Sequence, residues 1–414
     1  MRHWLKSGVL GAAAVLLLGV SCQAFKRPPE PATPVQRSDV ANVAAGDRAF
    51  AFRLFRVLRE RPDSFAFSPA GVRMALTMAW AGAESETAEE LGSVLGLAGD
   101  PTAIHQSNQA LLAVWRKAPL GGSAASFKLR VAQGFFAQTE RQPAQAFIEL
   151  LQRHYAAPFS PKDFAAPETV RSQVNLWVEK RTDERLGNFL PQGSLDSGLE
   201  LVLVSALDFE APWAKPFDPG HTHGGEFQLP GGKKTAKVEL LARTGEHLVN
   251  ETPEAQVVEL DYEGDGFVFD LIVPRGELAA FEAGFDEKKL DQLLSALAPK
   301  EVTVSLPRFE AGETVELTGA LQKIGIHAAL TPGKADFSTI TGTRKLHLSK
   351  LPHRIQLRVD EGATAERSGD AGAGKAPEPR GVEVRAVRPF LYLVRDKKRN
   401  LILGMGRYAG PAGG

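Results

Sequence analysis

Residues 65–97 read FAFSPAGVRMALTMAWAGAESETAEELGSVLGL and contain the patterns of two successive helices. Ser68 is typical of an N-cap, and Pro69 fits the first helical position, where no backbone N–H is needed. Gly82 is placed to end this first helix. Thr87 followed by Glu90 has the spacing of a capping box, which predicts the start of a second, short helix.

Outward from this stretch, the later part of the chain is dominated by strand patterns. Residues 199–209 (LELVLVSALDF) form a nearly continuous apolar run, which predicts a strand covered on both faces in the middle of a sheet. Residues 256–273 predict a hairpin whose turn contains two glycines. Helical patterns come first and strand patterns mostly later, so the sequence predicts an α+β fold rather than a regular βαβ alternation.

The composition indicates a soluble globular protein and excludes several function classes. The chain has 414 residues, of which 43% are hydrophobic and 24% charged, and Lys+Arg and Asp+Glu both number 49. A nucleic-acid partner would leave a basic excess, which is absent. We find no nucleophile elbow, phosphate-binding loop or zinc-protease motif, so we expect neither an enzyme nor a cofactor. The pair His221-x-His223 is interpreted as a surface turn rather than as half of a metal site.

The first 22 residues predict an export signal. A basic start precedes an apolar run at 9–20, which is too short to span a bilayer as a helix. The run ends at Gly19-Val20-Ser21-Cys22, which resembles a bacterial lipobox except that Gly19 stands where leucine is usual. Cys22 is the only cysteine, so no internal disulfide can form. We expect lipidation at Cys22 and attachment to a bacterial membrane, and the alternative is plain secretion.

The chain after Cys22 divides into a tether and one domain. Residues 23–41 contain four prolines early on and no apolar periodicity, which predicts a stiff, solvated tether. No linker and no internal repeat interrupts residues 42–410, so we expect a single domain. Within it, residues 362–381 (GATAERSGDAGAGKAPEPRG) contain no aromatic and no large aliphatic side chain. Such a segment cannot anchor itself in a core, and a long loop of this kind is usually functional.

Several stretches, in a fixed order, resemble the serpin family of serine protease inhibitors over about residues 42–410. They are residues 65–97 quoted above, VNLWVEKRTDERLGNFL (174–190), LVLVSALDFEAPWAKPF (201–217), QVVELDYEGDGFVFDLIVP (256–274), ADFSTI (335–340) and RPFLYLV with GMGR (388–407). The resemblance implies three β-sheets surrounded by eight or nine helices. It also places the reactive-centre loop at residues 362–381.

The resemblance implies a suicide-substrate mechanism. The target serine protease, or in some cases a cysteine protease, cleaves the loop, which then inserts into the main sheet and traps the acyl-enzyme. Insertion of the cut loop as an additional strand is a general property of this family, and it is expected of this chain only through the resemblance. The alternative is a non-inhibitory serpin, a binding or scaffold protein whose loop is cleaved as an ordinary substrate. We expect a monomer whose only membrane contact is the lipid at Cys22.

The loop's first part, its hinge, decides between these two functions, because an inserting strand needs small, uncharged inward side chains. The hinge residues are Glu361, Gly362, Ala363, Thr364, Ala365 and Arg367. In one register the inward residues are Thr364, Glu366, Ser368 and Asp370. In the other, shifted by one, they are Ala363, Ala365, Arg367, Gly369, Ala371 and Ala373. We favour the second, which buries mostly alanine and glycine and leaves Arg367 as the obstacle.

Two further sets of residues follow from the resemblance. The reactive bond is predicted at Lys375–Ala376, which would attract trypsin-like proteases, with Arg380–Gly381 as the alternative. A buried shutter network is predicted from His353, Ser68 and Ser205. Ser205 stands where the family usually has asparagine, so this network is expected to have one shorter hydrogen-bonding arm.

Overall fold

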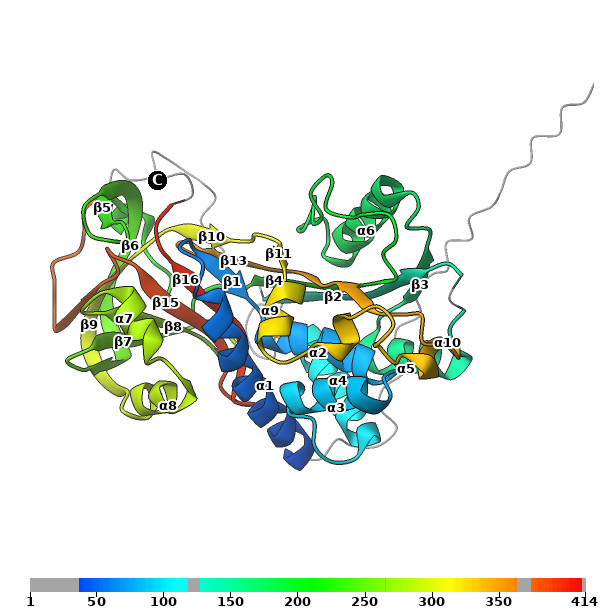
Figure 1. Cartoon of the computed structure of the whole chain (residues 1–414). Coiled ribbons are helices and arrows are strands. Elements are labelled where there is room, and N and C mark those ends of the chain that lie inside the picture. The colour runs from blue at the N-terminus through cyan, green and yellow to red at the C-terminus, as the bar shows by residue number, and fades with distance from the viewer. Residues whose placement is uncertain (1–36, 118–126, 141, 265, 363–373, 412–414) are drawn as a thin grey trace, which may run out of the picture.

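A computed structural model describes residues 37–117, 127–140, 142–264, 266–362 and 374–411 (Figure 1). Within these ranges the chain forms ten α-helices and two short 3₁₀ helices, against the eight or nine helices expected. The α-helices are α1 (Arg37–Leu58), α2 (Pro69–Trp80), α3 (Ser85–Leu95), α4 (Pro101–Lys117), α5 (Gln145–Tyr155), α6 (Pro167–Arg181), α7 (Leu278–Ala283), α8 (Glu287–Ser295), α9 (Thr318–Lys323) and α10 (Ser338–Thr341). The 3₁₀ helices are η1 (Pro219–His221) and η2 (Ala328–Leu330).

The strands of the described residues form a seven-stranded and a nine-stranded sheet. The seven-stranded sheet contains β2 (Lys128–Gln138), β3 (Phe159–Lys162), β4 (Leu201–Glu210), β10 (Phe309–Ala311), β11 (Val315–Glu316), β12 (Leu348–Lys350) and β13 (Pro352–Val359). The nine-stranded sheet contains β1 (Phe65–Phe67), β5 (His223–Gln228), β6 (Thr235–Glu251), β7 (Ala255–Asp261), β8 (Phe267–Pro274), β9 (Ala298–Pro307), β14 (Val382–Arg385), β15 (Phe390–Asp396) and β16 (Leu401–Tyr408). The expected α+β fold is confirmed.

The described strands form two hydrogen-bonded sheets where the resemblance implied three. The long strand β6 is the cause, because its 17 residues run on without a break. Its first part pairs with β5, its middle with β9 and its last residues with β7. Two groups of strands that the resemblance implied to be separate sheets are therefore joined into one sheet by β6.

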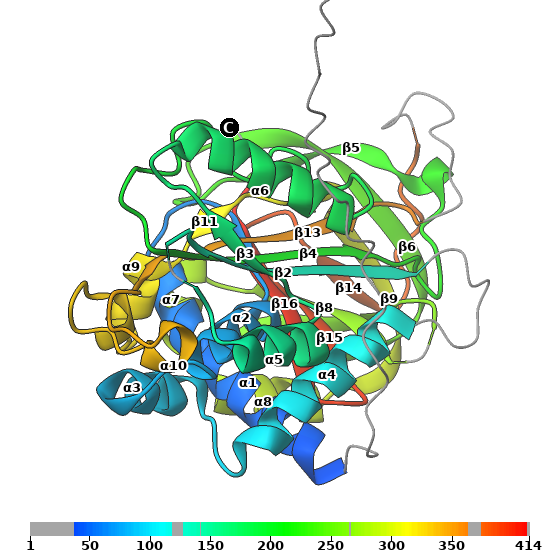
Figure 2. The same ribbon diagram turned by 90° about the vertical axis from the view of Figure 1, so that its right-hand side faces the viewer.

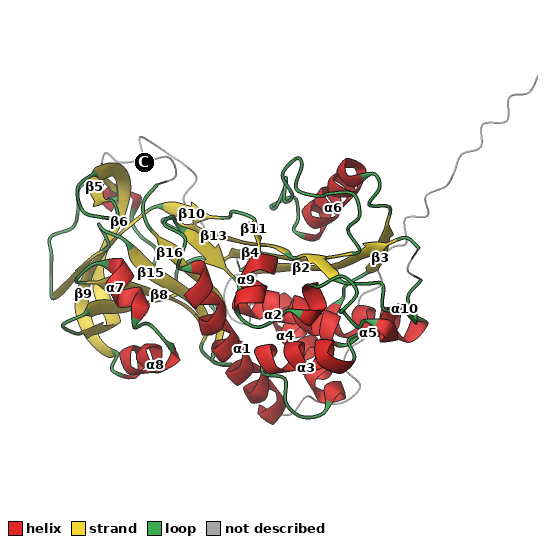
Figure 3. Cartoon of the chain, viewed as in Figure 1, coloured by secondary structure: helices red, strands yellow, loops and turns green. Residues whose placement is uncertain are grey.

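Strand β4 lies in the middle of the seven-stranded sheet, in the order β10-β13-β4-β2-β3, as its apolar run predicted. Figure 2 shows α6 on one face of this sheet and the group of helices around α2, α4 and α5 on the other. Val202, Val204 and Ala206 of β4 pack under α6, whereas Leu201, Leu203 and Leu207 belong to the larger core cluster. Figure 3 shows the same separation of α6 from the remaining helices.

The first helix of the opening stretch begins as predicted, and the second does not. Ser68 is the N-cap of α2 and accepts a hydrogen bond from the backbone N–H of Gly71. The capping box is wrong: α3 begins at Ser85, and Glu84, its N-cap residue, makes no side-chain capping bond.

The two polar side chains of that motif bind a distant segment instead. Thr87 accepts a hydrogen bond from Asp336 N–H, and Glu90 accepts from the N–H groups of His327 and Ala328. Both residues therefore hold α3 against residues 327–336. Local spacing in the sequence does not reveal this long-range contact.

Helix α1 begins at Arg37, inside the stretch predicted to be a tether. No proline follows Pro34 before this point, so nothing in the sequence prevents the helix from starting early. The earlier tether residues and Cys22 lie outside the described residues.

Candidate functional site at the loop after strand β13

The start of the predicted loop is fixed by a buried carboxylate. Glu361 is only 6% exposed, and its side chain accepts a hydrogen bond of 2.7 Å from the Thr222 hydroxyl and forms an ion pair with Arg308. Burial alone would raise the pKa of Glu361, but the bonds from Thr222 and Arg308 outweigh it and lower the pKa. The carboxylate therefore stays ionised and holds the chain in place.

The backbone at this point is held as well. Trp213 donates its indole N–H to the carbonyl of Asp360 at 2.8 Å, and Phe217 donates its N–H to the carbonyl of Glu361 at 2.9 Å. Gly362 follows with φ of +119°, a conformation that side chains disfavour. A Cβ there would touch Trp213 and Pro216 at an ordinary 3.5 Å, so it is the backbone angle that favours glycine.

The far end of the loop returns to the same place. Gly374 donates its N–H to the carbonyl of Thr222 at 3.0 Å, and Lys375 donates its N–H to the carbonyl of Gly220 at 3.1 Å. Thr222 is buried and so contacts both ends of the loop, through its hydroxyl and through its carbonyl. Sequence reasoning missed Thr222, although it lies between the two histidines of His221-x-His223.

The two predicted reactive bonds differ in how firmly their residues are held. Lys375 and Ala376 are exposed, and no described residue donates a backbone hydrogen bond to the carbonyl of Lys375. Arg380 donates its N–H to the Thr303 hydroxyl at 2.8 Å, and that hydroxyl donates to the Arg380 carbonyl at 3.1 Å. Gly381 has φ of +65°, and a Cβ on it would lie 1.9 Å from the carbonyl oxygen of Glu301.

The remaining hinge residues predicted from the sequence, Ala363, Thr364, Ala365 and Arg367, lie outside the described residues. The pair His221 and His223 is placed at η1 and at the start of β5. The described part of the chain contains no group of three or more His, Cys, Asp or Glu side chains arranged to hold a metal ion.

Strand β13, which leads into the loop, pairs in parallel with β4, with His353 opposite Ser205 and Leu357 opposite Phe209. Parallel pairing is slightly less stable per residue than antiparallel pairing. A strand that follows β13 by reversing direction and lies between β13 and β4 would be antiparallel to both. The geometry therefore offers a position where one more strand replaces a parallel pairing with two antiparallel ones.

The three predicted shutter residues lie together beneath this strand pair. Ser68 donates its backbone N–H to Nε2 of His353 at 2.8 Å, so Nε2 carries no proton. Nδ1 of His353 therefore carries the proton and donates to the Ser205 carbonyl at 3.0 Å or its hydroxyl at 3.1 Å. Gln133 of β2, which sequence reasoning missed, donates to the Gly71 carbonyl at 3.1 Å and lies 3.5 Å from the Ser205 hydroxyl.

Burial lowers the pKa of His353 to about 3, against a weaker opposing effect of its bond to the Ser205 carbonyl. The unfolded chain, with a histidine pKa near 6.5, takes up the proton first as the pH falls. We expect His353 to remove stability between about pH 6.5 and pH 3, at up to about 1.4 kcal/mol per pH unit. His353→Gln should unfold more easily at pH 7.5 but depend less on pH, as followed by thermal unfolding from about pH 7.5 to 4.5.

The matched control is His327→Gln, which makes the same replacement at an exposed histidine. Buried His105 and His247, whose pKa values burial lowers to about 4, add to the slope of all three proteins, so only the difference between them reports on His353. Equal slopes in the parent and in His353→Gln would contradict the assignment.

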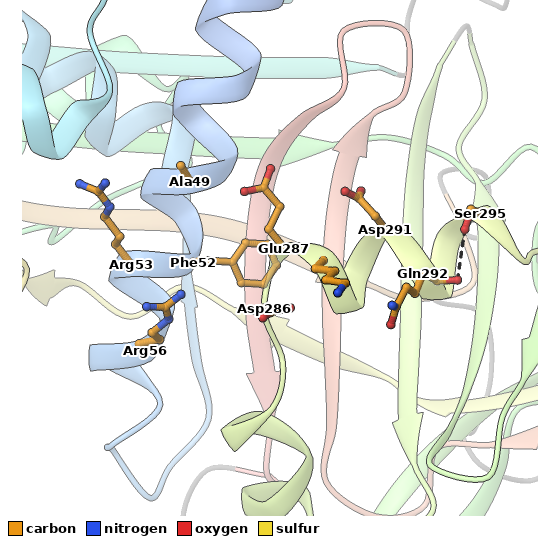
Figure 4. Close-up of a pocket in the computed structure, with 10 residues that line it drawn as sticks. Ala49, Phe52, Arg53, Arg56, Asp286, Glu287, Asp291, Gln292 and Ser295 are labelled. Atoms are coloured by element: carbon orange, nitrogen blue, oxygen red, sulfur yellow. Dashed lines mark hydrogen bonds between the residues drawn. The ribbon is translucent and has the colours of Figure 1, made fainter.

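A second surface feature lies away from the loop. An open groove of about 830 Å³ lies between α1 and α8. Figure 4 shows Arg53 and Arg56 of α1 on one side of it and residues of α8 on the other. Two carboxylates of its acidic wall, Glu287 and Asp291, share an ion pair with Arg48. Figure 1 places α8 at the opposite end of the nine-stranded sheet from β5, so this groove is separate from the loop.

The comparisons with known proteins agree on one family. A family model described as Serpin (serine protease inhibitor) matches residues 45–411. Human Serpin B8 is 30% identical over 375 residues, covering 87% of this chain and 97% of the relative. Human Serpin B3 is 28% identical over 395 residues, covering 89% of this chain and all of the relative. The leukocyte elastase inhibitor of Xenopus tropicalis is 28% identical, with the same coverage of 89% and 100%.

Solved structures share the fold at lower identity. Uncleaved ovalbumin has a TM-score of 0.80 at 22% identity and covers 89% of this chain and all of its own. Human thyroxine-binding globulin, solved with its hormone bound, also has a TM-score of 0.80 at 22% identity, covering 90% of this chain and 99% of its own.

Proposed function

The chain belongs to the serpin family, and from this premise we propose that it inhibits a serine protease by presenting residues 362–381 as a substrate. Serpins are not catalysts, so the chain is not an enzyme. The observation that carries the proposal is the parallel pairing of β13 with β4, directly below the buried start of the loop. After cleavage at Lys375–Ala376 the free strand has 14 residues, 362–375, and reaches roughly 46 Å, which exceeds the length of the ten-residue β4.

In the proposed reaction the protease serine attacks the carbonyl carbon of Lys375. An ester bond forms to the serine oxygen, the peptide bond to Ala376 breaks, and the nitrogen of Ala376 leaves with a proton as a free amine. Water would normally hydrolyse this ester. The freed loop instead inserts between β13 and β4 and carries the attached protease with it before hydrolysis occurs.

We propose Lys375–Ala376 as the reactive bond, and the hydrogen bonds of the two candidates support this choice. A protease binds an extended segment on both sides of the bond it cleaves. The carbonyl of Arg380 accepts from Thr303, and Gly381 packs against β9, so cleavage there first requires the end of the loop to detach. Lysine before the bond favours a trypsin-like protease, whose specificity pocket binds a cation.

The test is incubation of the purified protein with a panel of serine proteases, followed by denaturing electrophoresis. We expect a trypsin-like member to form a complex that survives detergent, because the ester between serine and Lys375 is covalent. Complete cleavage of the loop by every protease, without any such complex, would contradict the inhibitor function.

The second candidate is a non-inhibitory serpin that binds a ligand or partner and whose loop is only cleaved. Charged side chains at Glu366, Arg367 and Asp370 favour it, because burying them in a sheet is unfavourable. A protein with the same fold, human thyroxine-binding globulin, was solved in complex with a small ligand. The same electrophoresis experiment separates the two functions.

We further propose that the protein is exported and anchored to a bacterial membrane through a lipid at Cys22. The support is the lipobox-like end of the signal and the proline-containing stretch that follows. No helix in the described residues has the length and apolar character needed to cross a membrane. Cys22→Ser should move the protein from the membrane to the soluble fraction of fractionated cells, whereas a variant that stays entirely with membranes would disprove the anchor.

A further inference from the structure

Two basic side chains lie on the same face of β6, near the segment that precedes η1. Arg243 and His247 are four residues apart on the strand, with Gly245 midway, so all three share one face. The guanidinium of Arg243 lies 4.5 Å from the ring centre of Phe217. Arg243 and His247 are each only 7% exposed.

Both side chains have buried nitrogen atoms without a hydrogen-bonding partner among the described residues. These atoms are Nε and Nη1 of Arg243 and Nε2 of His247. The carboxylate of Asp261 acts on Arg243 electrostatically, but it accepts no hydrogen bond from either of the two unpaired guanidinium nitrogens. An unpaired guanidinium in such surroundings is unfavourable, and native proteins rarely keep one without a reason.

Lys215 brings a further positive charge to this pair, beside the carboxylate of Asp261. Lys215 donates its Nζ to the carbonyl of Glu246, which lies between Gly245 and His247 in the chain. Burial lowers the pKa of His247 to about 4, and the charges of Arg243 and Lys215 contribute to the lowering. His247 is therefore neutral at pH 7, and it can still act as a donor when its proton is on Nε2.

The position above Gly245 is open at close range. Gly245 has no side chain, and a Cβ added to it would find only Nε2 of His247 within 4 Å, at 3.8 Å. The space directly above this glycine is thus bounded by His247, on the strand face that also carries Arg243.

From this arrangement we propose that Arg243 and His247 bind a small oxyanion above Gly245. Oxygen atoms of phosphate, sulfate or a small carboxylate would accept from the unpaired N–H groups of Arg243 and from Nε2 of His247. Lys215 adds a second positive charge, and the aromatic ring of Phe217 shields one side of the guanidinium from water. The site does not depend on protease inhibition.

Thermal unfolding in increasing inorganic phosphate, at constant ionic strength set by sodium chloride, tests the site. Phosphate also stabilises proteins without binding, so the comparison must be between variants that share this general effect. Arg243→Met removes the guanidinium but keeps an apolar chain of similar length, and Lys237→Met removes an exposed positive charge from the same strand. The parent and Lys237→Met should gain about 2 °C over Arg243→Met when phosphate exceeds its Kd about tenfold.

Without phosphate, Arg243→Met should unfold at the parent's temperature or above it, because it removes an unpaired buried charge. Isothermal titration should show phosphate or acetate binding to the parent, weakened about tenfold in His247→Phe. If Arg243→Met does not fold, His247→Phe takes its place as the binding-deficient variant in the unfolding experiment. Equal phosphate responses in all variants, no heat of binding to the parent, or a lower midpoint of Arg243→Met in phosphate-free buffer would each overturn the proposal.

Discussion

Cleavage of the loop at Lys375–Ala376 should raise the thermal unfolding midpoint of the protein by at least about 10 °C. A strand inserted between β13 and β4 adds on the order of ten backbone hydrogen bonds, each with a net contribution of about 0.5–1.5 kcal/mol. A total of about 10 kcal/mol corresponds to a shift of roughly 13 °C in a domain of this size. Scanning calorimetry of the intact and the nicked protein measures the difference.

Two hinge variants make this result specific to insertion. Ala365→Glu and Thr364→Glu change neighbouring residues that face opposite sides of an inserted strand, although both lie outside the described residues. In the variant whose new carboxylate points inward, cleavage should raise the unfolding midpoint much less than in the parent. In the other variant the rise should be the same as in the parent. We expect Ala365→Glu to be the variant with the smaller rise. An unchanged midpoint after nicking of the parent would show that the loop does not insert.

Lys375→Ala should slow complex formation with a trypsin-like protease by about 100-fold or more. A pocket built to bind a cation keeps its buried carboxylate unpaired when the substrate offers only a methyl group, and discrimination of this kind is large. Arg380→Ala is the matched control, since it removes the same charge five residues further on. Its rate should stay within about threefold of the parent's, because the backbone of residue 380 keeps its two hydrogen bonds to Thr303 and does not enter the specificity pocket.

The rate of complex formation, followed by loss of protease activity, gives this comparison. Mass spectrometry of the released C-terminal peptide identifies the bond independently. A peptide beginning at Ala376 agrees with the prediction, whereas one beginning at Gly381, together with a slow Arg380→Ala, would reverse it.

Local patterns in the sequence predicted the elements well where a single segment carries the signal. The N-cap at Ser68 and the doubly covered strand β4 are both present. The capping box of Thr87 and Glu90 failed because both side chains serve contacts with residues more than 200 positions away. A capping motif and a tertiary contact use the same side chains, and spacing alone does not distinguish them.

The central residues of the site could be predicted from the sequence, but the residues that bind to Glu361 could not. Glu361, Ser68, Ser205 and His353 follow from the resemblance, and the structure places the last three in one network. Thr222 and Arg308, which hold Glu361, come from segments more than 50 residues away. A buried carboxylate does require a cation, so a partner was to be expected, but nothing local to Glu361 says which arginine it is.

The double contact of Thr222 closes the loop into a ring. Its hydroxyl holds Glu361 and its carbonyl holds Gly374, so the twelve residues between them are tethered at both ends. The proposed reactive bond after Lys375 lies just outside this ring, and cleavage there would leave the ring closed. This end of the loop is released only when the bonds of Gly374 to Thr222 and of Lys375 to Gly220 open, which regains the entropy of loop closure. In the proposed mechanism, ring opening and ester hydrolysis therefore compete from the moment of cleavage. The protease is trapped if the ring opens first, and it escapes if the ester is hydrolysed first.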